Sequence, residues 1–369
     1  MRILITGGAG FIGSHLADQL LAEGHRVRAL DVLAEQVHGP GAVRPNYLHQ
    51  EVEFVRGDVR DRDRVRRALK GIDAVFHLAA AVGVGQSMYQ VADYTSVNNV
   101  GTAVLLELLI ERPVERLVVA SSMSIYGEGM YCNDAGKIVT GRERSLEQLR
   151  RGDWEVRDDS GSPLLPVPTL ESKVPSLASV YALSKYDQER LSLMIGAAYG
   201  IPTVALRFFN VFGTRQALSN PYTGVLAIFA SRLLNDRPPL VFEDGLQQRD
   251  FVSVHDVARA CLLALKAERA TGLAINIGSG RAYAVSEVAL LLADVLSRNQ
   301  VPEIRGKYRV GDIRHCFADI TLARRALGYQ PAVPLEQGIV ELAEWLEGQV
   351  ADDRVEEASA QLAARGLTV

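Results

Sequence analysis

The chain has 369 residues, of which 48% are hydrophobic and 23% are charged, and its formal net charge is −4. This composition can bury a large core and excludes a disordered protein. The slightly acidic balance and the lack of a basic run argue against a nucleic acid partner. No apolar run approaches the ~18 residues of a membrane span, and strand-like residues begin at Arg2, so we expect a cytoplasmic protein without a membrane partner.

The cysteines also limit the class of protein. Cys132, Cys261 and Cys316 are far apart and show no Cys-x-x-Cys spacing. This pattern fits reduced thiols better than a disulfide framework or a zinc site. We therefore expect no structural metal.

Strand-like and helical patterns alternate along the first two thirds of the chain. Short runs rich in β-branched and other apolar residues precede amphipathic segments, at residues 3–5, 27–30, 52–55, 74–78, 117–120 and 203–206. Such alternation predicts an α/β fold with a doubly wound, mostly parallel sheet of the Rossmann type and right-handed crossovers. Beyond residue 207 the chain breaks into shorter elements, with helices expected at 256–265 and 286–296.

A glycine-rich turn follows the first predicted strand. Gly7, Gly10 and Gly13 stand between that strand and a helical pattern. A turn of this kind lets backbone amides approach a pyrophosphate, and the helix N-terminus adds partial positive charge. The second strand ends at Asp31, where a dinucleotide fold presents a carboxylate to the adenosine ribose. Because this carboxylate should repel a 2′-phosphate, NAD is favoured over NADP.

A tyrosine and a lysine four positions apart, Tyr181 and Lys185, project from one face of a predicted helix. An ammonium beside a phenol favours the phenolate, so the oxygen can act as a base nearer neutral pH. Such a pair alone is common on solvated helix faces. The glycine turn in the same chain favours the catalytic interpretation.

The glycine spacing, the Tyr181/Lys185 pair and the motifs around Asp58, His77 and Asn98 resemble the extended short-chain dehydrogenase/reductases that act on nucleotide sugars. The resemblance runs from Met1 to about Trp345. It implies that NAD is the cofactor and that Asp58 meets the adenine, Asn98 lies near the nicotinamide ribose and Phe209 packs by the nicotinamide. The residues it assigns to the cofactor are Gly7, Gly10, Phe11, Ile12, Gly13, Asp31, Asp58, Val59, Leu78, Ala79, Ala80, Asn98, Tyr181, Lys185 and Phe209.

The same resemblance assigns the catalytic and substrate residues. Ser122, in Ser121-Ser122-Met-Ser124-Ile-Tyr126-Gly127, matches the catalytic hydroxyl beside Tyr181 and Lys185. On the substrate side it implies that arginines and an asparagine hold a diphosphate, an aspartate binds the nucleotide ribose, and a small residue leaves room beside the sugar. These substrate residues are Ser124, Asn210, Arg249, Arg309, Asp312 and Cys316.

The residues after Ser122 favour one reaction. Dehydratases of the family place an acidic pair there, whereas this chain has Met123 and Ser124, and neither can act as a general acid. We therefore expect an isomerase, a nucleotide-sugar 4-epimerase that inverts C4 of a UDP- or dTDP-hexose through a 4-keto intermediate. A 6-deoxyhexose such as dTDP-L-rhamnose leads slightly. A dehydratase or reductase of the same family, or a non-catalytic dinucleotide sensor, are the alternatives.

The predicted organisation has three parts. Residues 1–206 form the NAD-binding Rossmann domain, with an insertion at about 129–172 that is either a solvated loop or a lid or subunit contact near the site. Residues 207–347 form a smaller C-terminal α/β substrate lobe, with some elements returning to the sheet. Residues 348–369 read as a terminal helix or charged tail without assigned chemistry. Helices at 98–110 and 180–197 match those that relatives use for a homodimer.

Overall fold

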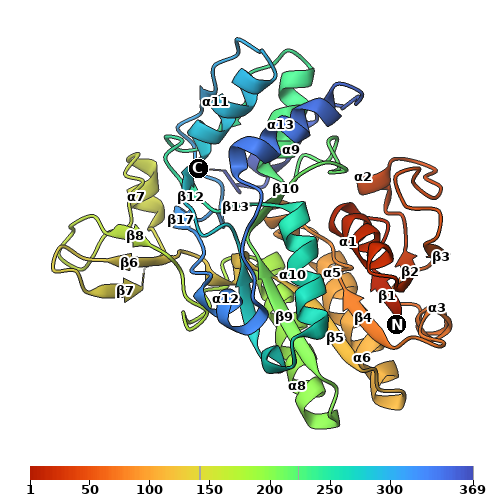
Figure 1. Ribbon diagram of the computed structural model, residues 1–369. Coiled ribbons are helices and arrows are strands. Elements are labelled where there is room, and N and C mark those ends of the chain that lie inside the picture. Colours follow the sequence, from red (N-terminus) through yellow and green to blue (C-terminus); the bar gives the residue numbers. More distant parts are fainter. Residues whose placement is uncertain (141–142, 223, 369) are drawn as a thin grey trace.

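A parallel sheet of seven strands forms the centre of the molecule in the computed structural model, which describes residues 1–140, 143–222 and 224–368 (Figure 1). Across the sheet the strands are β14 (Ala274–Ile277), β9 (Thr203–Phe208), β5 (Arg116–Ser122), β4 (Ala74–His77), β1 (Arg2–Thr6), β2 (Arg26–Asp31) and β3 (Glu53–Arg56). The predicted doubly wound α/β fold is confirmed. The six predicted strands are present, each within two residues of its predicted ends, and β14 returns from the later part of the chain.

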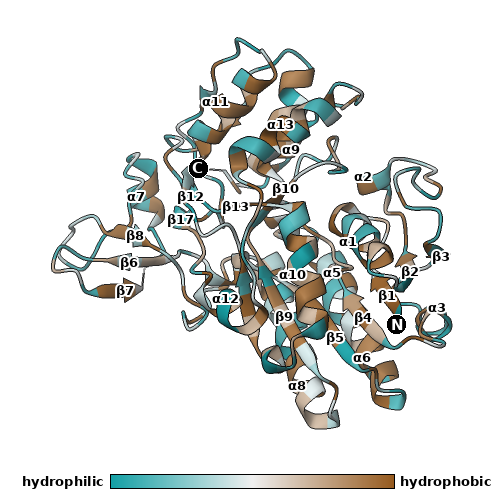
Figure 2. Ribbon diagram, viewed as in Figure 1, coloured by the Kyte–Doolittle hydropathy of each residue, from teal (hydrophilic) through white to brown (hydrophobic). Residues whose placement is uncertain are grey.

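Helices cover both faces of this sheet. One face carries α1 (Phe11–Ala22), α10 (Val254–Lys266) and α12 (Thr321–Leu327), and the other carries α3 (Arg62–Ala68), α6 (Gly101–Glu111) and α8 (Val180–Tyr199). Figure 2 shows the hydrophobic residues concentrated in the strands between these layers. Because both faces are covered, the central strands β1, β4, β5 and β9 are apolar along most of their length, as a parallel sheet requires.

A second core supports the smaller lobe, which lies above the sheet in Figure 1. It packs the helices α9 (Val225–Leu234), α11 (Val285–Val295) and α13 (Leu335–Leu346) against one another. Short strands of this part of the chain form small sheets separate from the central one: β10 (Asn210–Phe212) pairs with β13 (Phe251–Ser253), β11 (Leu240–Val241) pairs with β16 (Glu303–Ile304), and β12 (Gln248–Arg249) lies between β15 (Tyr283–Ala284) and β17 (His315–Cys316).

The insertion at 129–172 folds into a small unit of its own, at the left of Figure 1. Strand β6 (Met130–Cys132) lies between β7 (Ile138–Thr140) and β8 (Leu165–Val167), and α7 (Leu146–Arg150) follows β7. Tyr131, Val156 and Leu164 form its buried core. It is therefore an ordered, packed unit within the described residues rather than a solvated loop.

Several short elements complete the chain, and a final helix follows the second lobe. The short elements are α2 (Glu35–His38), α4 (Val84–Ser87), α5 (Val91–Thr95), the π-helical turn η1 (Ser96–Val100), and the 3₁₀ turns η2 (Met123–Tyr126) and η3 (Glu268–Ala270). The final helix is α14 (Val355–Ala363). The helices of the described residues lack the length and hydrophobicity of a membrane-spanning segment.

Candidate active site

A cleft of about 800 Å³ opens at the carboxyl ends of the central strands, and we call it the main cleft. It lies where the strand order reverses between β1 and β4, the place at which doubly wound sheets bind ligands. The predicted residues that line it are Gly7, Gly10, Phe11, Ile12, Gly13, Asp31, Asp58, Val59, Leu78, Ala79, Ala80, Ser122, Ser124, Tyr181, Lys185, Phe209, Asn210, Arg249, Arg309 and Asp312.

Gly7 and Gly13, in and just after the turn that follows β1, leave no space for a side chain. A Cβ atom at Gly13 would lie 2.3 Å from the backbone oxygen of Gly7. Gly7 itself has φ +71°, and a Cβ there would lie 2.9 Å from the backbone nitrogen of Ala79. The helix α1 begins directly after this turn, so its N-terminal amides lie beside the main cleft. A cradle of bare backbone at a helix N-terminus fits the pyrophosphate of a dinucleotide.

Two carboxylates stand in the same half of the main cleft. Asp31 accepts hydrogen bonds from the backbone amides of Ala9 at 3.0 Å and Leu33 at 2.9 Å, which ties the end of β2 to the glycine turn. Asp58 is held by the guanidinium of Arg60, with Nη2 at 2.6 Å, and these hydrogen bonds lower the pKa of Asp58. Both acids are therefore fixed at the cleft wall by the chain itself.

Ser122, Tyr181 and Lys185 meet at the other half of the main cleft. Ser122 ends β5, and its hydroxyl donates to that of Ser124 at 3.2 Å. Helix α8 begins after Ser179, whose side chain caps the amide of Ala182 at 3.1 Å. This start places Tyr181 and Lys185 in the first turns of the helix, facing the main cleft.

Burial controls the charge states of the pair. It raises the pKa of Tyr181, and a hydrogen bond with Ser122 opposes this rise. Burial also lowers the pKa of Lys185 to about 7. The sequence predicts that Lys185 lowers the pKa of Tyr181. Among the groups of the chain itself the pKa of Tyr181 is instead raised, because desolvation of the phenol outweighs its favourable contacts.

A buried polar network behind Lys185 was not expected from the sequence. The Lys185 ammonium donates to the side-chain oxygen of Gln188 at 2.7 Å, and the Gln188 amide donates to the hydroxyl of Thr102 at 2.8 Å. His77 lies between the hydroxyls of Thr6 and Thr102, and burial lowers its pKa to about 3. This network fixes the position of the ammonium. The sequence signal for Gln188 was its place one turn after Lys185.

The arginines predicted to hold a diphosphate lie on the opposite wall, in the smaller lobe. The Arg309 guanidinium pairs with Asp312 at 2.8 Å and lies over the ring of Phe242, 5.3 Å from its centroid. Arg249 donates to the backbone oxygens of Ile313 and of Arg314, the latter at 2.9 Å. Arg249 thus ties the segment that follows Asp312 to the end of β12.

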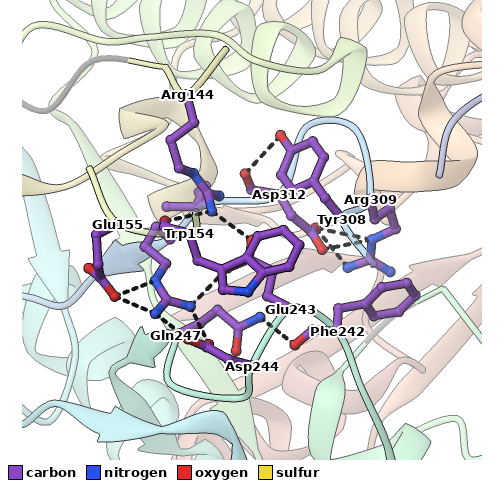
Figure 3. Close-up of polar contacts among 12 residues, drawn as sticks. Arg144, Trp154, Glu155, Phe242, Glu243, Asp244, Gln247, Tyr308, Arg309 and Asp312 are labelled. Atoms are coloured by element: carbon purple, nitrogen blue, oxygen red, sulfur yellow. Dashed lines mark hydrogen bonds and ion pairs between the residues drawn. The ribbon is translucent and has the colours of Figure 1, made fainter. Parts of the chain in front are cut away.

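The insertion reaches this wall through ion pairs that are buried or partly buried (Figure 3). Arg314, whose side chain is 0% exposed, pairs with Glu243 at 2.9 Å, with Asp244 at 2.6 Å and with Glu155 of the insertion. Arg144, also from the insertion, pairs with Glu243 at 2.8 Å. The insertion therefore supports the loop that follows Phe242, beside Arg309.

The family model described as the NAD dependent epimerase/dehydratase family matches residues 3–146 and 159–278 of the chain. The chain belongs to this family. It is thus an NAD-dependent enzyme, and the glycine cradle fits that cofactor.

Several relatives of this epimerase/dehydratase cover nearly all of it. A dTDP-L-rhamnose 4-epimerase of Burkholderia thailandensis is 36% identical over 350 residues, 94% of each chain. A crystal structure of UDP-glucose 4-epimerase with UDP-glucose from Thermotoga maritima has a TM-score of 0.76 and 31% identity, covering 94% of this chain and 99% of that one. A UDP-glucuronic acid 4-epimerase from Bacillus cereus, in complex with UDP-glucuronic acid and NAD, has a TM-score of 0.77 and 27% identity, with the same coverage.

Two residues predicted for the site lie outside the lining of the main cleft. Asn98 is fully buried and bonds both backbone atoms of Ala81, at 2.7 and 3.0 Å, and the hydroxyl of Ser184 at 2.8 Å. It joins the segment after β4 to helix α8. Cys316 is buried against Thr169, with Sγ 3.7 Å from its hydroxyl, because β17 turns this side chain away from the cleft wall.

The end of the chain adds cleft residues that the sequence analysis missed. Val355, Ala358, Ser359 and Leu362 of α14 line the main cleft. The apolar spacing of this helix gave a signal for a packed face, but its charged, alanine-rich composition did not indicate the partner of that face.

Proposed function

We propose that the enzyme is a nucleotide-sugar 4-epimerase whose substrate is a dTDP-linked 6-deoxyhexose or a UDP-hexose. The observation that carries the proposal is one cleft lined by Ser122, Tyr181 and Lys185 on the sheet side and by Arg249 and Arg309 on the other. Residues 1–206 would hold NAD and residues 207–347 the nucleotide sugar.

The side chains have distinct roles in this proposal. Tyr181 removes the proton of the sugar 4-hydroxyl, and Ser122 hydrogen-bonds the same oxygen. Lys185 holds the nicotinamide ribose. Bound NAD would take the hydride from C4, return it to the other face of the ketone, and as a cation favour the phenolate of Tyr181.

The turning of the sugar requires firm binding elsewhere. A guanidinium can donate paired hydrogen bonds to phosphate oxygens, so Arg249 and Arg309 suit a diphosphate. Arg309 is paired with Asp312 in this structure. We infer that a diphosphate competes with Asp312 for this guanidinium, which frees the carboxylate for the nucleotide ribose.

The residues beside Ser122 support epimerisation over elimination. Met123 is buried at the cleft wall and Ser124 hydrogen-bonds Ser122, so this position offers a thioether and a hydroxyl. Neither is an acid that could protonate a leaving hydroxyl. The 36% identity to a dTDP-L-rhamnose 4-epimerase supports a deoxyhexose as the first substrate to test.

The test is to incubate the purified enzyme, without added cofactor, with a panel of UDP- and dTDP-sugars and to resolve the stereoisomers by NMR. We expect retained NAD and interconversion of one C4 pair. In a parallel incubation with added NADH, its stoichiometric oxidation would indicate a reductase, and an ultraviolet-absorbing keto product in alkali would indicate a dehydratase. No turnover with any sugar would favour a dinucleotide sensor.

A further inference from the structure

The C-terminal segment, residues 352–368, forms a wall of the main cleft. Helix α14 turns Ala358, Ser359 and Leu362 toward the cleft, and Ala358 and Leu362 are 5% and 3% exposed. The segment lies between the two halves of the molecule, so it is placed to contact a ligand that spans them.

Three distant parts of the chain converge at Leu362. A Cβ atom placed on Gly85 of α4 would lie 3.2 Å from Cδ2 of Leu362 and 3.6 Å from Cδ of Arg309. Leu362 of α14 and the Arg309 side chain therefore both pack beside α4. The stem of Arg309 is thus enclosed between the NAD half and the C-terminal helix.

The main chain of the segment also holds the loop that carries Arg309. The amide of Val310 donates to the backbone oxygen of Leu367 at 3.0 Å, and Arg309 forms an antiparallel bridge with Thr368. These contacts fix the backbone of Arg309 while its guanidinium stays at the cleft.

Side-chain contacts anchor the segment to both halves. Arg232, buried in the second lobe, pairs with Asp353 and Glu356, each at 3.3 Å. The side-chain oxygen of Gln361 accepts hydrogen bonds from Tyr222 of the second lobe at 2.9 Å and from Tyr89 of the NAD half at 3.1 Å. The segment is therefore a strap across the cleft.

We propose that the C-terminal strap is part of the nucleotide-sugar site: Ser359 and Leu362 cover the diphosphate side of the bound substrate, and the backbone at 367–368 positions Arg309. This rests on the proposed function. The strap would strengthen binding in two ways. A fixed Arg309 loses less conformational entropy when the diphosphate binds. An apolar cover excludes water, which strengthens the attraction between the guanidinium and the phosphates.

The experiment measures the binding of UDP and of dTDP by calorimetry, together with kcat, KM and retained NAD. One variant ends at Glu357, which keeps the partners of Arg232 and removes Ser359, Leu362 and the 367–368 backbone. A second variant, Ser359→Phe, keeps the strap and fills the cleft beneath it. We expect both to weaken binding of the preferred diphosphate, and to raise KM, at least about tenfold, with kcat changed less than about threefold and NAD retained.

The matched control is Ala363→Ser, on the exposed side of the same helix, which should leave binding unchanged. The proposal would be overturned if both variants bound the diphosphate with wild-type affinity. It would also be overturned if they lost turnover and their bound NAD while their diphosphate affinity stayed unchanged. If the shortened chain does not fold, Ser359→Phe decides alone. Diphosphate binding without epimerisation of any sugar would reject the proposed function but leave this test intact, whereas a wild-type enzyme that binds neither diphosphate would overturn both.

Discussion

Tyr181 is held more tightly than a surface helix residue would be. Its ring meets that of Tyr94 edge to face, with centroids 6.5 Å apart, and its backbone amide donates to the hydroxyl of Ser87 at 3.0 Å. Both contacts lock the phenol at the cleft wall. The hydroxyl therefore faces Ser122 without the need for a conformational change.

Replacing the phenol should remove the base and leave the fold intact. We expect Tyr181→Phe to lower kcat by about 10²–10⁴-fold, the usual contribution of a positioned acid or base, with NAD still bound. Initial rates by NMR and the NAD content of the purified protein measure this. Tyr186→Phe, one position after Lys185 and outside the main cleft, is the control and should keep wild-type rates. Unchanged turnover in Tyr181→Phe would remove Tyr181 from the mechanism.

Lys185 should make stability depend on pH. Because burial depresses its pKa to about 7, the unfolded chain binds more protons than the folded chain between about pH 7 and pH 10, and stability rises with pH across that window. Lys185→Met removes this contribution of Lys185 to the pH dependence of stability. From about pH 6 to about pH 9.5, we expect the wild type to gain about 1–3 kcal/mol of unfolding free energy relative to the variant. Urea unfolding at both pH values measures the difference, and parallel profiles for the two proteins would contradict the expectation.

At the scale of elements, the insertion at 129–172 is a support for the binding wall. Arg314 joins it to the second lobe, and hydrogen bonds from His315 and Arg314 lower the pKa of Glu155 to about 2, so this partner stays ionised. Two acids of the second lobe, Glu243 and Asp244, depend on the same guanidinium. The loop after Phe242 is thus held by ion pairs of Glu243 and Asp244 with Arg314 and of Glu243 with Arg144 of the insertion.

Breaking this cluster should be costly. We expect Arg314→Met to lower the free energy of unfolding by about 3–5 kcal/mol, because the buried Glu243 and the partly buried Asp244 and Glu155 lose this guanidinium. The control is Arg151→Met, which removes an ion pair with Glu147 whose side chains are 65% and 83% exposed, and which should change stability by less than about 0.5 kcal/mol. Denaturant unfolding of both variants tests this. Equal, small effects would mean that the cluster does not hold the wall.

The elements also show where sequence reasoning reaches its limit. The glycine turn and the Tyr181/Lys185 helix could be predicted because their local spacing carries the chemistry. Cys316 could not be placed, since the direction of its side chain depends on how the two-residue strand β17 pairs with β12. The role of the C-terminal strap could not be predicted either, because its partners Tyr89, Tyr222 and Arg309 are remote in sequence.

At the scale of the whole molecule, the cleft combines a predictable half and a half that depends on tertiary contacts. The strand ends of the parallel sheet bring Gly7, Asp31 and Ser122 to one edge, and topology alone requires this. The opposite wall is assembled from β12, the loop around Arg309, the insertion and the C-terminal strap. Its short strands give weak sequence signals, so its geometry follows only from packing.

Apolar side chains are exposed on the outer side of the layer formed by α6 and α8. Leu183 and Met194 lie about three helical turns apart on one side of α8 and are 46% and 58% exposed, and Val100 just before α6 is 50% exposed. Apolar side chains on adjacent helices suit a symmetric contact between two copies, so we predict a homodimer. Leu183→Glu should raise its dissociation constant at least about tenfold, because two charges would be buried across the two-fold axis. Light scattering after gel filtration measures the mass, and Leu290→Glu, at a 49% exposed leucine on α11, is the control that should stay dimeric. A wild-type monomer, or a Leu183→Glu variant that stays dimeric at low concentration, would place any contact elsewhere.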